Sequence, residues 1–364
     1  MKHVIVYEQA GQFAGWPANN GLWCWGGQEI LVGLTVGDFQ EKRGHNIAEP
    51  YRSILARSTD QGETWTAVRP EVFVDSGGAV RKLTDPIDFA ADGFAMRVVG
   101  TGYHASTRAE GSFYVSDDRG DTWRGPYSFG SLTDHPQLRG LEVTSRTDYV
   151  VDGRHDCLLM MSARGSSTLT DRVFCARTTD GGRSFSFVSW VIGPDHPHRA
   201  VMPSTVRCSS GQLVSAIRRR QVGTQRCWVD AYRSADYGLS WQQLGKVTDT
   251  GPWNGNPPAL VGLADGRLCC IVGDRGTCRI VARCSTDEGK TWGGGIVLRA
   301  NFRPDRYGDP DLGYPRVARR SDSNLIAIYY WATEAVPHQH IAATIWRPDE
   351  NIPCVHPQPP LRCG

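Results

Sequence analysis

The sequence has little that would place it in a membrane, on nucleic acid or in a disulfide-bonded scaffold. Its 364 residues carry a formal net charge of +2, which gives no general signal for nucleic acid. No apolar run approaches the length of a membrane span. The opening MKHVIVYEQAGQ holds an apolar stretch of only four residues, too short for the core of a signal peptide. We therefore expect no membrane or nucleic-acid partner, and a cytoplasmic protein is favoured over an exported one whose leader was removed.

Cysteine spacing excludes a second class of fold. The eleven cysteines show no repeated spacing, and Cys269-Cys270 sit inside an apolar run that resembles a buried strand. This pattern indicates packing residues rather than a disulfide framework. Stability must then come from a sizeable apolar core.

One eight-residue motif recurs five times along the chain. It follows the pattern S/T-x-D-x-G-x-S/T-W/F, and its copies begin at Ser58, Ser116, Thr178, Ser234 and Ser285. This motif is the Asp-box, a tight turn between antiparallel strands. The Asp carboxylate accepts backbone N–H groups, and the Gly takes a backbone shape that is costly for other residues. Because the copies start 51 to 62 residues apart, they predict a repeat architecture.

A second repeat marks the same units. Hairpin turns between apolar runs lie at 26–27, 92–93, 152–153, 210–211, 265–266 and 323–324. The last of the six units has no Asp-box and lacks a final strand, which the run His3–Tyr7 is well placed to supply. We predict an all-β, six-bladed β-propeller in one domain over residues 1–350, followed by a Pro-rich tail at 351–364. A seventh, degenerate unit is the alternative.

Propeller geometry places certain loops on one rim. The Asp-boxes join the third and fourth strands of each unit, so the loops between the second and third strands open on the opposite rim, together with the connections between units. Arginines recur there: Arg108, Arg164, Arg219 within Arg218–Arg220, Arg275 and Arg316. In a nearly neutral protein, guanidinium groups around one opening suit a carboxylate held in bidentate fashion. Ion pairs with Asp and Glu between blades are the alternative for each arginine.

The same rim carries aromatic, amide and imidazole groups. Trp253, Asn254 and Tyr314 can stack on sugar faces or bind hydroxyls, so we expect an acidic oligosaccharide or polysaccharide as the partner of a monomeric protein. For Trp16, packing is an equal alternative. His45 and His104 fall in adjacent loops, and Tyr330 is a further candidate for moving protons. No metal-ligand spacing completes a site around the H-x-H pairs at 196–198 and 338–340, so no metal or cofactor is expected.

The Asp-boxes resemble those of the sialidase superfamily along nearly the whole chain. Sialidases carry the first arginine of a triad in a Phe-Arg-Ile-Pro motif, whereas the stretch Tyr7–Trp23 here has no Arg. Other motifs resemble propeller enzymes that remove rhamnose from glucuronic acid in arabinogalactan, described as α-L-rhamnosidases or L-rhamnose-α-1,4-D-glucuronate lyases. These motifs are FAGWPAN (13–19), EILVGLTVGDF (29–39), GHN (44–46), NGNPPAL (254–260) and DLGYPR (311–316). Members of that family are usually exported and seven-bladed, which differs from our reading of this chain.

The rhamnose-glucuronate resemblance implies that a histidine of the first blade, His45 here, is central to an exo-acting elimination. Such a reaction needs a cation to neutralise the uronate, a base for the C5 proton and an acid for the departing oxygen. Arginine supplies the first, and His45 with His104 or Tyr330 the others. Hydrolysis by a rhamnosidase or exo-sialidase stays open, because five carboxylates share the rim: Glu41, Glu142, Asp309, Asp311 and Glu334. A non-catalytic glycan-binding propeller also stays open.

Overall fold

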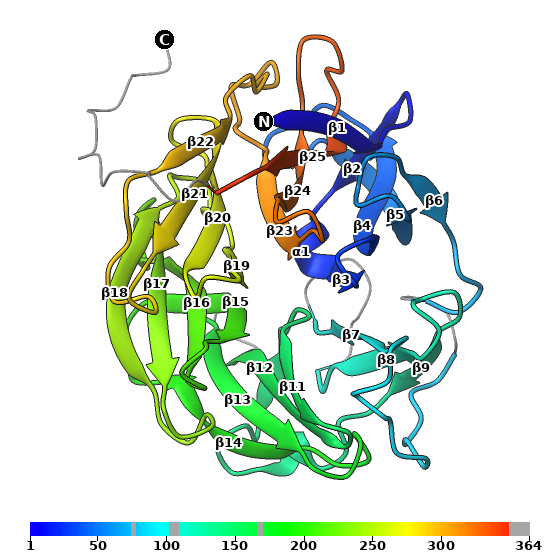
Figure 1. Ribbon diagram of the computed structural model, residues 1–364, viewed down its shortest axis with the longest axis vertical. Coiled ribbons are helices and arrows are strands. Elements are labelled where there is room, and N and C mark those ends of the chain that lie inside the picture. Colours follow the sequence, from blue (N-terminus) through cyan, green and yellow to red (C-terminus); the bar gives the residue numbers. More distant parts are fainter. Residues whose placement is uncertain (74–77, 102–108, 166–169, 349–364) are drawn as a thin grey trace.

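The computed structural model describes residues 1–73, 78–101, 109–165 and 170–348. Its secondary structure is almost entirely β, and the strands form six antiparallel sheets arranged as blades in a ring (Figure 1). The predicted six-bladed β-propeller is confirmed. No seventh sheet occurs within the described ranges.

The blades are numbered here by their order along the chain. Blade one holds β2 (Gln12–Gly15), β3 (Leu22–Trp25), β4 (Glu29–Phe39), β5 (Ile47–Ser58) and β6 (Thr66–Val68). Blade two holds β7 (Ala95–Val99), β8 (Ser112–Ser116) and β9 (Arg124–Tyr127). Blade three holds β10 (Leu141–Val143), β11 (Tyr149–Gly153), β12 (Asp156–Gly165), β13 (Arg172–Thr178) and β14 (Ser186–Ile192), preceded by a 3₁₀ helix at Leu132–Asp134.

The remaining blades each contain four strands. Blade four holds β15 (Arg199–Arg207), β16 (Leu213–Arg220), β17 (Cys227–Ser234) and β18 (Gln242–Asp249). Blade five holds β19 (Ala259–Gly262), β20 (Leu268–Asp274), β21 (Arg279–Ser285) and β22 (Ile296–Arg299). Blade six holds β23 (Gly313–Arg319), β24 (Leu325–Trp331) and β25 (His340–Trp346), together with β1 (Lys2–Tyr7) from the start of the chain.

The first and last strands of the chain close the ring. β1 pairs antiparallel with β25, in a register that sets Lys2 opposite Ile345 and Val4 opposite Ala343. Blade six is thereby completed to four strands in the order β1-β25-β24-β23. Closure brings blade six beside blade one, so residues separated by most of the sequence become neighbours.

A short helix interrupts the inner part of blade one. α1 (Pro17–Asn20) lies between β2 and β3, which both pair with β4, and Figure 1 places it near the centre of the ring. All four of its residues are buried. Gly33 of β4 allows the close approach, because a Cβ there would lie 2.6 Å from the Cβ of Asn20. The helix therefore packs closely against β4.

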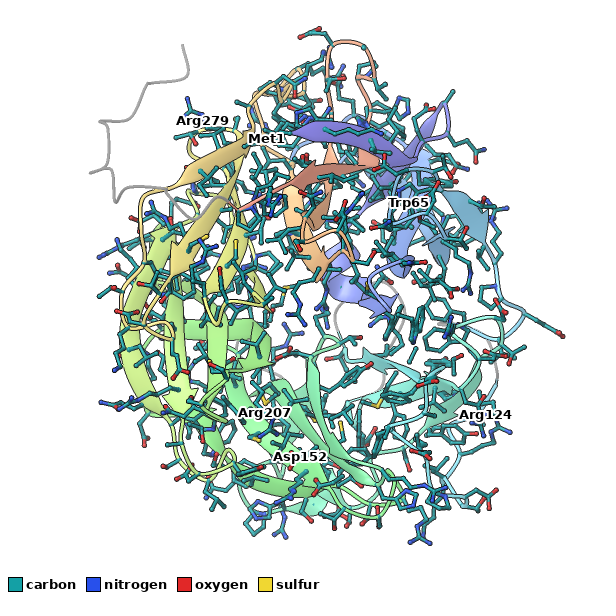
Figure 2. All side chains as sticks on the ribbon, viewed as in Figure 1. Met1, Trp65, Arg124, Asp152, Arg207 and Arg279 are labelled. Carbon is teal, nitrogen blue, oxygen red and sulfur yellow. The ribbon has the colours of Figure 1, made fainter. Side chains whose placement is uncertain are left out.

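The Asp-boxes form the turns that their sequence predicts. In the first box Asp60 Oδ1 accepts the backbone N–H of Thr64 at 2.9 Å, and Ser58 Oγ accepts that of Gly62 at 2.8 Å. Gly62 has φ +89°, a left-handed value that disfavours side chains. Trp65, labelled in Figure 2, donates its indole N–H to the carbonyl of Gly62 and packs against the core shared by blades one and six.

The core consists of apolar clusters between adjacent blades. Ile30 and Ile54 of blade one pack with Ile326 and Ile328 of blade six in the largest cluster. The cysteines among the described residues are free thiols and most are buried, in agreement with a packing role. In the described part of the chain, no helix has the length and apolar character needed to cross a membrane.

The Asp-box carboxylates make the stability of the fold depend on pH in the acid range. Burial alone would raise the pKa of Asp60, but hydrogen bonds from Thr64 and Ser58 outweigh it and lower the pKa to about 2. A carboxyl whose folded pKa is depressed contributes stability above its ordinary pKa near 4, and that contribution is lost as the pH falls toward the folded value. We expect Asp60→Asn to flatten the fall in melting temperature between about pH 4 and pH 2. Thermal melts across this range test it, with the exposed Asp195→Asn on the opposite rim as control.

Candidate active site

His45 and Asp311 meet on the rim opposite the Asp-boxes. His45 lies in the loop between β4 and β5, and Asp311 lies just before β23 in the neighbouring blade six. The Nδ1 of His45 is 2.8 Å from Oδ1 of Asp311. The imidazole is 43% exposed while the Asp311 side chain is fully buried. An ionised carboxylate at Nδ1 favours the tautomer with the proton on that nitrogen, which leaves Nε2 free to accept a proton.

Two further groups hold Asp311 in its ionised form. The hydroxyl of Tyr330 donates to Asp311 Oδ1 at 2.6 Å, and Arg275 donates to the Tyr330 oxygen at 2.9 Å. Burial alone would raise the pKa of Asp311, but the charges and hydrogen bonds of His45, Arg275 and Tyr330 together lower it. Burial and the Asp311 carboxylate raise the pKa of Tyr330 well above its usual range, so Tyr330 stays protonated and donates. Because Tyr330 is itself fully buried, it acts on His45 only by way of its hydrogen bond to Asp311.

Trp16 fixes the plane of the imidazole. Its ring meets the ring of His45 edge to face, with centroids 5.0 Å apart and an interplanar angle of 83°. Trp16 directly precedes α1, has a left-handed φ of 57° and is almost completely buried. A further aromatic neighbour is Tyr330, at 6.4 Å. The indole of Trp16 thus packs beside both the imidazole of His45 and the buried ring of Tyr330.

Two buried arginines place positive charge beside this pair. Arg218 donates to the hydroxyl of Tyr314 at 3.0 Å and to the backbone carbonyl of Asn254 at 2.8 Å. Arg275 donates to the backbone carbonyl of Trp253 as well as to Tyr330. Both guanidinium groups lie over the ring of Tyr314, at 5.5 and 5.8 Å from its centroid. Arg218 forms no ion pair within the described ranges, so no carboxylate there is in contact with its charge.

Three arginines predicted for the opening have other partners. Arg219 lies next to Arg218 in β16, and successive strand residues point to opposite faces. Its side chain is buried against Asp230 and Tyr232, so the structure brings Arg218, and not Arg219, to the site. Arg164 is 3.4 Å from Glu142 in an ion pair. Arg316 donates to two backbone carbonyls, those of residues 18 and 147. His104 and Arg108 lie outside the described residues.

Arg316 belongs instead to a set that holds α1. Three arginines from blades two, three and six each donate to one residue of this helix: Arg97 to Asn20 Oδ1, Arg146 to Asn19 Oδ1 and Arg316 to Ala18 O. Because α1 follows Trp16 directly, these contacts fix the support of the imidazole. This role was not evident from the sequence, because nothing in it distinguishes an arginine that holds α1 from an arginine that faces the opening.

Exposed aromatic side chains border the opening. Trp253 is 46% exposed, and both it and Asn254 take left-handed φ values, 59° and 69°. Tyr307 is 36% exposed, with the guanidinium of Arg43 at 5.3 Å and that of Arg306 at 4.8 Å from its ring centroid. Such faces suit stacking against a sugar ring.

Metal ligands do not gather in the part of the chain that the structure describes. No group of three or more His, Cys, Asp or Glu side chains there could hold a metal ion. The chemistry available from the residues of this site is proton transfer by His45 and charge stabilisation by arginine.

The chain belongs to the BNR repeat-like domain family, whose model matches residues 53–327. A search of curated proteins finds no match. Among solved structures, it is similar to a protein of unknown function from Dyadobacter fermentans, with 19% identity, a TM-score of 0.68, and coverage of 94% of this chain and 97% of that one.

Two similar structures have named activities. The Hadza microbial sialidase Hz136 has 14% identity and a TM-score of 0.59, with coverage of 92% of this chain and 66% of that one. A Penicillium chrysogenum α-L-arabinanase, solved with arabinobiose, has 14% identity and a TM-score of 0.57, with coverage of 95% and 98%. At these identities the likeness concerns the fold, a sialidase-like propeller.

Proposed function

We propose that the chain is an exo-acting carbohydrate-active enzyme that releases L-rhamnose from a glucuronate-containing glycan by β-elimination. The observation that carries the proposal is the half-exposed imidazole of His45, oriented by the buried carboxylate of Asp311. Supporting it are the positive charge of Arg218 and Arg275 and the fold shared with propellers titled sialidase and arabinanase. The resemblance of the chain's motifs to those of rhamnose-glucuronate enzymes supports the choice of substrate.

The geometry of glucuronate lets one imidazole serve as both base and acid. In D-glucuronate the C5–H and C4–O bonds lie on the same face of the ring. Nε2 of His45 would take the C5 proton, the C–H electron pair would form the C4–C5 double bond, and the C4–O bond would break. The same proton then passes to the departing oxygen, which leaves as the hydroxyl of rhamnose. Arg275 and Arg218 are buried, so they would act on the substrate carboxylate through their charge, which would stabilise the negative charge that develops as C5 loses its proton.

Hydrolysis would require two carboxylates that flank the glycosidic bond. Of the five candidates on this rim, Asp311 is fully buried and Asp309 is almost so. The other three are in ion pairs: Glu41 with Arg306, Glu142 with Arg164 and Glu334 with Arg303. None of the five is both exposed and unpaired, and this favours elimination.

A direct assay separates the alternatives. Incubation with a rhamnosyl-glucuronate oligosaccharide should release rhamnose and raise absorbance near the ultraviolet edge, because elimination creates a C4–C5 double bond conjugated to the carboxylate. Rhamnose without the absorbance would indicate hydrolysis. Binding without any product would indicate a non-catalytic glycan-binding propeller, and sialic acid release from a fluorogenic substrate would indicate a sialidase.

Two of the five arginines predicted for substrate binding, Arg275 and Arg164, should behave differently. Arg275→Lys keeps the charge but loses the forked donor that reaches Tyr330 and Trp253. We expect a loss in kcat/KM of about tenfold to a hundredfold, since these contacts support the His45–Asp311 pair and one charge-assisted contact contributes roughly 1.5–3 kcal/mol. Arg164→Ala should stay within about threefold of wild type, because Glu142 already neutralises that guanidinium. Steady-state kinetics test both, and equal losses would contradict the assignment.

A further inference from the structure

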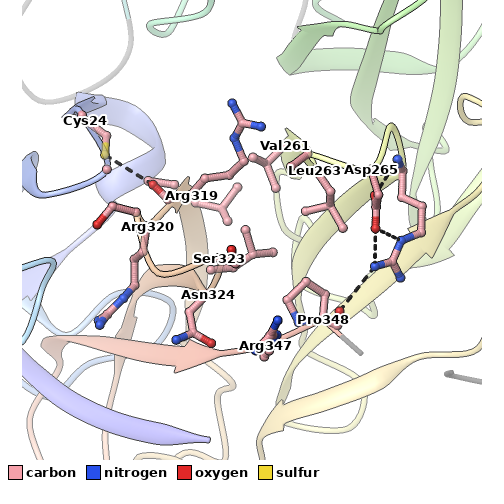
Figure 3. Close-up of a pocket in the computed structure, with 18 of the residues that line it drawn as sticks. Cys24, Val261, Leu263, Asp265, Arg319, Arg320, Ser323, Asn324, Arg347 and Pro348 are labelled. Carbon is pink, nitrogen blue, oxygen red and sulfur yellow. Dashed lines mark hydrogen bonds and ion pairs between the residues drawn. The ribbon is translucent and has the colours of Figure 1, made fainter. Parts of the chain in front are cut away.

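A cavity opens on the rim that carries the Asp-boxes, away from His45. Its volume is about 1280 Å³, and its lining comes from blades one, five and six (Figure 3). The strand β23 connects the two regions, because it begins beside Asp311 and ends at Arg319, which lines the cavity. At a rise of about 3.3 Å per residue, the two ends of β23 lie roughly 20 Å apart. Within the described ranges, the cavity shares no lining residue with the candidate active site.

One part of the cavity wall is apolar. Val317 of β23 and Val261 of β19 line it, together with Leu263 and Leu22. These four side chains are only partly buried, so each keeps apolar surface that faces the open space. The apolar side chains of the lining are aliphatic, and none of the described lining residues is aromatic. The lining thus lacks the flat platform on which sugars stack, and it suits a hydrocarbon or aromatic body.

The charges around this wall are unbalanced. Among the described residues, four arginines line the cavity against one acidic residue, Asp265. Arg267 pairs with Asp265 at 2.6 Å, and Arg320 pairs with Glu63 outside the lining. Arg319 and Arg347 are exposed and form no ion pair with any residue that the structure describes. Two guanidinium groups are therefore available next to the apolar wall.

We infer that this cavity is a binding site for an amphipathic organic anion, with its apolar body against Val261, Leu263 and Val317 and its anionic group on Arg319 or Arg347, which lie on different sides of the cavity (Figure 3). Guanidinium groups bind sulfonates and carboxylates through paired N–H donors. Burial of the apolar body adds the hydrophobic contribution. The site is independent of the reaction proposed above, because the two use different residues on opposite rims.

The probe 8-anilinonaphthalene-1-sulfonate matches both halves of this site, since it joins an aromatic body to a sulfonate. We expect saturable binding with one equivalent per chain in fluorescence and calorimetric titrations. N-phenyl-1-naphthylamine carries the same rings without the sulfonate, and it should bind at least about tenfold more weakly. The doubly substituted Arg319→Gln/Arg347→Gln protein should also lose at least about tenfold in affinity for the sulfonate, because neither guanidinium group is left to bind it.

Matched controls keep this test independent of folding and of catalysis. Arg183→Gln removes an exposed arginine from the third Asp-box on the same rim and should bind the probe like wild type. Near-ultraviolet circular dichroism must be unchanged in all variants, because loosely packed states also bind this dye. Turnover of glycan should be unaffected by Arg319→Gln/Arg347→Gln. Absence of saturable binding to the wild type, or equal binding by the double variant or by the uncharged analogue, would overturn the inference.

Discussion

His45→Ala should abolish turnover of a rhamnosyl-glucuronate substrate while the propeller stays folded. General acid–base catalysis by a positioned side chain contributes about 10²- to 10⁴-fold, and His45 is proposed to act as both base and acid. The side chain is 43% exposed, so its removal takes little from the core. Steady-state kinetics give the rate, and circular dichroism and the melting temperature confirm the fold.

The matched control is His338→Ala. His338 also lies on this rim, but its Nε2 is 3.0 Å from Oε1 of Glu8. It should retain activity. Added imidazole should restore part of the turnover of His45→Ala, since it can enter the space that the side chain leaves, and a purely structural defect would not respond. Activity of His45→Ala within a few-fold of wild type would make His45 a bystander.

The fold was predictable because each of its signals is local and repeated. Every Asp-box encodes its own turn through the contacts of Asp60 and its equivalents, and five copies at even spacing leave few alternatives to a propeller. Other features depended on contacts between distant segments. Nothing in the PANN sequence of α1 announces a short buried helix near the centre of the ring, because arginines from three different blades hold it there.

The candidate site was predictable only in part. Loop position identified His45 and Arg275. Arg218 and Arg219 are neighbours in β16 and point to opposite faces of the sheet. Which of them faces the site depends on the register of β16 with β15 and β17. Asp311 was one of five carboxylates on the rim, and only the closure of blade six against blade one makes it the partner of His45. The sequence did not decide between a packing role and a binding role for Trp16, because the residue stands next to Pro17. Contacts such as that between His45 and Asp311 are made by tertiary structure, and the sequence around each residue does not reveal them.

Asp311→Asn should lower kcat by about three orders of magnitude while leaving KM within a few-fold. A buried carboxylate that orients a catalytic imidazole has an effect of about 10⁴ in the serine protease triad, and the principle carries over to a His–Asp pair. The side-chain amide that this substitution introduces can donate to Nδ1 of His45, which would move the proton of the ring to Nε2. The atom that faces the substrate would then no longer accept the C5 proton.

The comparison with Tyr330→Phe makes this prediction specific. Tyr330 donates to the same Asp311 oxygen but does not carry the charge, so its removal should cost only about tenfold in kcat, in line with one lost hydrogen bond. Both variants alter the buried contacts of Arg275, and a general loss of packing would affect them alike. A proton resonance from Nδ1 of His45 should be present in wild type and Tyr330→Phe and absent in Asp311→Asn. If Asp311→Asn and Tyr330→Phe instead lose the same amount of activity, the carboxylate charge is not what orients the imidazole, and the role assigned to Asp311 fails.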